Sequence, residues 1–147
     1  MLKEKPMLRF NGSIWCSLDI ALRNIDQIFR NKVQQLGLTV IEWYVLRALY
    51  DTDGQQASQL ASEVGRAATS FTPNLDKLQE KGYIMRLPDP SDRRAVLIHL
   101  TNKALEEKDT ILQLADDLDS QLESRFSDGE FECFQHVLVE LQSVEID

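Results

Sequence analysis

Residues 66–77 carry small hydrogen-bonding side chains and two cations within a stretch of helical apolar spacing. Hydroxyl and ammonium groups bind phosphate oxygens, and an asparagine amide suits the edge of an adenine. These side chains therefore predict contacts to double-stranded DNA, although Thr69 or Ser70 also suits a helix N-cap and Lys77 a solvated charge. The predicted DNA-contacting residues of this segment are Arg66, Thr69, Ser70, Thr72, Asn74 and Lys77.

Two further cations, Arg93 and Arg94, end a turn-like segment, 88–94, that is rich in proline and aspartate. Short apolar runs at residues 83–87 and 95–100 flank it, and together they predict a β-hairpin. An arginine at such a tip suits a narrow minor groove, where the negative potential of DNA is concentrated. We therefore predict that Arg93 and Arg94 contact DNA; the alternative is a pair of solvated surface charges.

Residue types that perform catalysis or bind metals are sparse. The two cysteines, Cys16 and Cys133, lie far apart, and the two histidines belong to no recognisable catalytic motif. We therefore expect no disulfide framework, no metal, no cofactor and no enzyme activity. Every apolar run is far shorter than the roughly 20 residues that span a bilayer, and residues 1–6 do not resemble the core of a signal peptide. A cytoplasmic protein is the expectation.

The net charge of −8 at first argues against a nucleic-acid partner, but the charge is unevenly distributed. Residues 66–94 contain six bases and four acids, a net charge of +2. Residues 102–147 contain three bases and thirteen acids, a net charge of −10. We therefore expect the acidic part of the chain to lie away from any DNA.

The elements that must position these side chains follow from apolar periodicity and capping residues. Thr39 with Glu42, and Ser127 with Glu130, have the spacing of capping boxes, and Thr101 is a predicted N-cap. A short turn at residues 65–68 joins two helices in a helix-turn-helix pattern, and the hairpin follows directly as a wing. Helices are predicted at residues 13–35, 39–50, 57–64, about 69–81, 101–122 and 127–141.

Pro73 interrupts the pattern of the second of those two helices, because proline disfavours helical geometry at the residue before it and lacks a backbone donor. Either the helix begins at Pro73 with Thr72 as its cap, or it begins earlier and includes Phe71. The four- and three-residue spacing of Phe71, Leu75 and Leu78 favours the earlier start.

The fold class predicted is mainly α with a small β-hairpin: a winged helix-turn-helix domain with long N- and C-terminal dimerisation helices. We expect a single domain over residues 1–147, with a DNA-binding lobe at about 39–101. The apolar stripes of about 10–36 and 102–145 exceed what so small a lobe can cover. Burying them favours a symmetric homodimer.

The segments 60–82, 89–94 and 97–101, which contain the helix-turn-helix and the Asp-Arg-Arg of the wing, resemble the MarR family of transcription regulators. The resemblance extends over about residues 10–143. It implies a homodimer on a pseudo-palindromic DNA site, usually a repressor, often released by a small anionic or phenolic ligand or by an oxidant.

The resemblance also implies roles for single residues. Asp92 would brace Arg94 and leave Arg93 at the wing tip. Cys16 lies near the reactive cysteine of hydroperoxide-sensing members, although a lone cysteine in an amphipathic helix more often packs as a small hydrophobe. Three aromatic residues would line an effector pocket or simply belong to the core; they are Trp15, Trp43 and Tyr44.

The acidic C-terminal half and the modest charge of residues 66–94 also suit a second function. A winged-helix dimer of this kind can serve as a protein-interaction module without binding DNA. The two functions differ in their response to salt, because DNA binding weakens steeply as the salt concentration rises.

Overall fold

The computed structural model describes residues 7–65 and 68–145, except for the side chains of residues 68–70. The predicted fold class is confirmed: the chain is mainly helical and carries one two-stranded hairpin. The strands are β1 (Ile84–Asp89) and β2 (Asp92–Leu100). The helices are α1 (Arg9–Gly12), α2 (Ile14–Gln35), α3 (Val40–Asp51), α4 (Ala57–Val64), α5 (Ala68–Glu80), α6 (Asn102–Glu106), α7 (Lys108–Glu123) and α8 (Asp128–Gln142).

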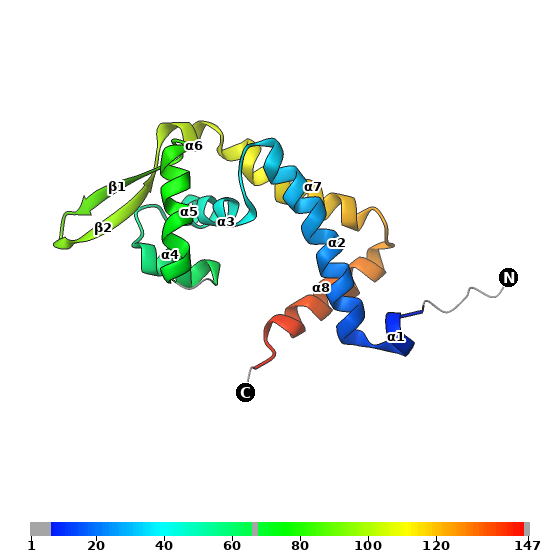
Figure 1. Ribbon diagram of the computed structural model, residues 1–147. Coiled ribbons are helices and arrows are strands. Elements are labelled where there is room, and N and C mark those ends of the chain that lie inside the picture. The colour runs from blue at the N-terminus through cyan, green and yellow to red at the C-terminus, as the bar shows by residue number, and fades with distance from the viewer. Residues whose placement is uncertain (1–6, 66–67, 146–147) are drawn as a thin grey trace.

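Two groups of elements are separated along the molecule (Figure 1). Helices α3 to α6 and the hairpin form one group, here called the hairpin lobe, from which the hairpin projects at the far left of the view. Helices α1, α2, α7 and α8 form the other group, here called the arm, in which α2 and α7 pack side by side. The hairpin and α8 therefore lie far apart in the molecule (Figure 1).

The hairpin is longer than the sequence indicated. The antiparallel register runs regularly from Ile84 with Leu100 to Pro88 with Val96 and then shifts, so that Asp89 pairs with Asp92 and two residues form the tip. The carboxylate of Asp89 accepts hydrogen bonds from both the backbone N–H and the hydroxyl of Ser91. This turn explains why the strands extend into the segment that was predicted to be a loop, because it satisfies polar groups locally.

A third segment joins the hairpin through residue Gln55. Its backbone N–H donates to the carbonyl of Ile98 at 3.2 Å, and the N–H of Ile98 donates back at 2.7 Å. Asp53 extends this contact, since its carboxylate accepts from the backbone N–H of Leu100 at 2.9 Å. The hairpin is thereby held to the loop between α3 and α4.

The caps of α6 and α8 form as the sequence indicated, but that of α3 forms only in part. The Thr39 hydroxyl accepts from the Glu42 N–H at 3.2 Å. The Glu42 carboxylate does not complete a capping box; it is fully buried and binds the Lys81 ammonium at 2.6 and 2.9 Å. A salt bridge to a residue beyond α5 thus replaces the predicted local hydrogen bond.

Helix α5 begins at Ala68 and includes Phe71, as the apolar spacing favoured. Pro73 lies inside the helix rather than in its first turn, which removes one donor from the helical hydrogen bonds. Phe71, Leu75 and Leu78 are all buried, so the apolar face fixes the orientation of the helix. Gly82 ends the segment with a φ of +82°, where a side chain would be strained.

The long helix predicted from residue 101 to 122 is divided at Glu107. Thr101 caps the short α6, and α7 starts afresh at Lys108. The Tyr50 hydroxyl donates to the Ala104 carbonyl at 2.6 Å, which is the acceptor that a continuous helix would offer to the N–H of Lys108. Tertiary contact with α3 therefore accompanies the break.

Candidate nucleic-acid interface

The outward face of α5 is the first part of the candidate interface. Burial of its apolar face against the core leaves Thr72 and Lys77 exposed and Asn74 half-buried. Thr69 and Ser70 lie in the first turn of the same helix, but their side chains are outside the described part of the structure, as is all of Arg66. Three predicted contacts are thus placed, and the other three are not described.

The hairpin tip is the second part. Arg93 and Arg94 are both exposed, and neither takes part in the ion pairs found among the described residues. The Asp92 carboxylate accepts a hydrogen bond from the backbone N–H of Arg94 at 3.0 Å. The contact expected of Asp92 is therefore made to the main chain of Arg94, which leaves the guanidinium groups directed to solvent.

The Asp89 carboxylate orders the tip from the other strand. Its hydrogen bonds from the backbone and side chain of Ser91 hold its pKa below the ordinary value, because they stabilise the charged form. The tip that carries Arg93 and Arg94 thus depends on an ionised aspartate.

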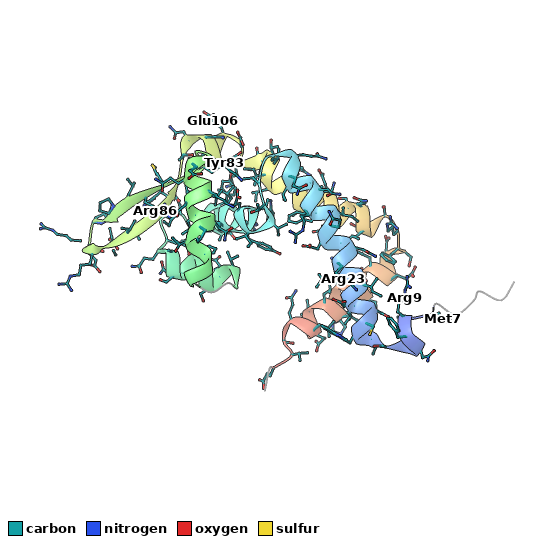
Figure 2. All side chains as sticks on the ribbon, in the orientation of Figure 1. Met7, Arg9, Arg23, Tyr83, Arg86 and Glu106 are labelled. Atoms are coloured by element: carbon teal, nitrogen blue, oxygen red, sulfur yellow. The ribbon has the colours of Figure 1, made fainter. Side chains whose placement is uncertain are left out.

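Arg86 is a residue of the site that sequence reasoning missed. It projects from β1 and binds the Asp76 carboxylate of α5 at 2.7 Å and the side-chain oxygen of Gln79. Figure 2 shows Arg86 on the side of the hairpin that adjoins α5. Ten residues separate Arg86 from Asp76 in the chain, and only the packing of β1 against α5 brings them together.

The ion pairs change the charge that the interface offers. Of the six bases in residues 66–94, Lys81 is paired with Glu42 and Arg86 with Asp76. Of the other bases in this segment, Lys77, Arg93 and Arg94 are exposed and take part in none of the ion pairs found among the described residues. Positive charge is therefore concentrated at α5 and the hairpin tip.

The three aromatic residues predicted to share a pocket are not brought together within one chain. Trp43 is buried, donates from its indole N–H to the Ile111 carbonyl at 2.8 Å, and makes an edge contact with Tyr44. Trp15 is 74% exposed near the start of α2. It lies roughly 20 Å along the helix from Phe29, the residue of α2 that packs on Trp43.

A hollow of about 290 Å³ between α3 and α7 has Trp43, Arg47 and Lys108 in its lining. Neither Trp15 nor Tyr44 lines it. Trp43 is thus the single member of the predicted aromatic set that reaches this space.

The two cysteines differ in environment. Cys16 is half-buried near the start of α2, and Cys133 is exposed on α8. Residues 7–65 and 68–145 contain no group of three or more His, Cys, Asp or Glu placed to hold a metal ion. In the same ranges, no helix is both long and apolar enough to span a bilayer.

Tyr83 lies where the hairpin lobe meets the arm. Its hydroxyl donates to the Glu107 carboxylate at 2.7 Å, and the Lys103 ammonium lies 4.3 Å from the centre of its ring. Burial and the hydrogen bond to Glu107 raise the pKa of Tyr83 from its ordinary value of 10.0 to about 12. Neighbouring Tyr50, which bonds Ala104, also has a raised pKa, chiefly because it is buried.

A family model described as the MarR family matches residues 38–96 of the chain. The chain is 31% identical over 91 residues to YkoM of Bacillus subtilis, an uncharacterized HTH-type transcriptional regulator. That alignment covers 62% of this chain and 59% of YkoM, so the match spans less than two thirds of the relative.

Solved structures extend the likeness over most of the chain. A probable transcriptional regulator from Pseudomonas aeruginosa has a TM-score of 0.80 and 26% sequence identity, covering 90% of this chain and 99% of that one. The S. aureus MepR protein, solved as a complex with DNA, has a TM-score of 0.79 and 22% identity, covering 90% and 98%. At 22% identity, the likeness to MepR shows a shared fold.

Proposed function

Because the chain belongs to the MarR family of winged-helix regulators, we propose that it is a homodimeric transcription regulator, acting as a repressor at a pseudo-palindromic DNA site. The observation that carries the proposal is the exposure of Arg93 and Arg94 on the projecting hairpin tip, in addition to the polar outward face of α5, while their acidic neighbours bind main-chain groups of the tip. Cations on a projecting hairpin and polar groups on a helix face are the two features with which winged helices contact DNA.

The dimer is supported by apolar side chains that one chain leaves exposed. None of the described side chains of α8 is buried, and the start of α2 is also apolar and exposed. In a symmetric pair these surfaces would cover one another and present two hairpin lobes. Helix-turn-helix dimers place such lobes about 34–36 Å apart, one turn of DNA.

We also propose that a small ligand or an oxidant regulates the protein by releasing it from DNA. The hollow beside Trp43, whose lining includes the cations Arg47 and Lys108 and the carboxylates Asp51 and Asp116, is the candidate place for an anionic or phenolic molecule. The candidate sensor of an oxidant is Cys16. We expect the substitution Cys16→Ser to abolish any effect of peroxide on DNA binding. If peroxide acts equally on the Cys16→Ser variant, Cys16 is not the sensor.

The test is selection of bound duplexes from a random pool by the purified full-length chain. A palindromic consensus, bound with an affinity that falls steeply as salt rises, would support both the function and the symmetry. Failure to bind any duplex, even at low salt, would instead favour the protein-interaction module. An unrelated winged-helix dimer with a known operator serves as the positive control of the selection.

A further inference from the structure

Asp76 occupies an unfavourable place for a protein that contacts DNA. It follows Thr72 by one helical turn on α5, so the two residues lie on the same side of the helix. Its side chain is 56% exposed, whereas the pairing Arg86 side chain is 29% exposed. An uncompensated carboxylate at this position would face the phosphates together with Thr72.

Two contacts hold the Arg86 side chain against α5. Its guanidinium reaches Asp76 at 2.7 Å and also binds the side chain of Gln79, so one cation holds two residues of adjacent turns of α5. A planar guanidinium suits such a double contact better than an ammonium does. Fixed in this way, Arg86 has fewer donors left for a phosphate.

We propose that Arg86 is a positioning residue that neutralises Asp76 on the DNA-facing side of α5. The inference rests on the proposed function and extends it, because it assigns a role to a cation that makes no DNA contact of its own.

The experiment measures duplex affinity and its salt dependence for Arg86→Met, Asp76→Asn and the double variant, with the full chain and its selected duplex. Arg86→Met exposes the Asp76 charge, and we expect binding to weaken about tenfold or more. Adding Asp76→Asn removes that charge, and we expect the double variant to return to within about threefold of the unchanged protein. Asp76→Asn alone is expected to bind as well or better, with a steeper salt slope.

A double variant as weak as Arg86→Met would overturn the inference, because it would show that Arg86 contacts phosphate or maintains the fold. Unchanged binding by Arg86→Met would overturn it as well. If Arg86→Met does not fold, the single variant Asp76→Asn still decides, since weaker binding by it contradicts the proposed role. If the unchanged chain binds no duplex, the proposed function itself fails first.

The matched control is the exposed ion pair between Arg23 and Asp19 on α2, at 2.9 Å. Figure 2 shows Arg23 on the arm, well away from the hairpin. Arg23→Met and Asp19→Asn are expected to leave duplex affinity and its salt slope unchanged. A loss equal to that of Arg86→Met would mean that any broken surface pair lowers binding.

Discussion

The hairpin lobe and the far end of the arm contain similar apolar side chains but bury them to different extents. In the lobe, Leu46, Leu49 and Leu60 are fully buried. On α8, Phe134 and Leu138 are 37% and 39% exposed. The lobe therefore completes its core within one chain, whereas the apolar face of α8 would have to be covered by a second chain.

The lobe and the arm also differ in where their charged side chains lie. Residues 107–147, which contain α7 and α8 of the arm, have a net charge of −10, whereas the lobe exposes Lys77 on α5 and Arg93 and Arg94 at the hairpin tip. Acidic side chains on the arm would repel DNA from that end. The proposed dimer is consistent with this division if apolar faces of the arms meet and both hairpins point outward.

The largest expected effect comes from charge on the apolar face of α8. We expect Phe134→Asp combined with Leu138→Asp to weaken the dimer by about 6 kcal/mol or more, because each lost apolar contact counts once in each copy. Sedimentation equilibrium would measure the change as conversion to monomer. Duplex affinity would fall with it, since two linked half-site contacts become one.

The control adds the same charge to the other side of the helix, with His136→Asp and Ser143→Asp. Both residues are exposed, and helical spacing places them away from the face of Phe134 and Leu138. We expect a dimer of unchanged affinity. Equal dissociation of both variants would show that overall charge, rather than this face, determines the association.

The second prediction concerns the core of the lobe. Leu46→Ala leaves a cavity and is expected to lower the free energy of unfolding by about 2–5 kcal/mol. Urea unfolding followed by circular dichroism measures the loss, while Leu105→Ala, at a position that is 54% exposed, should change it by less than about 0.5 kcal/mol. A small loss at Leu46 would contradict the view that the lobe has its own close-packed core.

Local rules predicted most of the fold. The helical spacing of Phe71, Leu75 and Leu78 corresponds to a buried face, and Ser127 with Glu130 forms the capping box that its spacing indicated. These features depend on residues within one or two helical turns. A sequence therefore displays them directly.

Features that depend on distant contacts could not be predicted in this way. Glu42 binds Lys81 rather than its own helix end, Tyr50 contacts the junction of α6 and α7, and Arg86 pairs with Asp76. Each joins elements whose packing is set by the whole core. Trp15 and Trp43 do not meet within one chain, because Trp15 is exposed near the start of α2 and Phe29 is the α2 residue that contacts Trp43.

The third prediction tests whether DNA contact belongs to the lobe alone. Arg93→Ala and Arg94→Ala are each expected to weaken duplex binding about tenfold and to flatten its salt slope, because each removes an exposed cation from the hairpin tip. Arg125→Ala, an exposed cation at the end of α7, is the control and should change neither quantity. Fluorescence anisotropy over a salt series measures both the duplex affinity and its salt slope. Unchanged binding in both hairpin variants would count against the wing as a DNA contact.

The smallest expected effect lies at the junction of the two regions, where Tyr83 bonds Glu107. The pKa of Tyr83 is raised to about 12 from 10.0, so between these values the folded chain keeps a proton that the unfolded chain loses. The stabilisation is complete below about pH 10 and is lost as the pH rises through 12. At pH 11 we expect unfolding free energies to show a loss of about 1 kcal/mol that is absent from Tyr83→Phe. If both proteins lose stability equally from pH 9 to 11, the burial of the Tyr83 hydroxyl and its bond to Glu107 do not couple its protonation to stability.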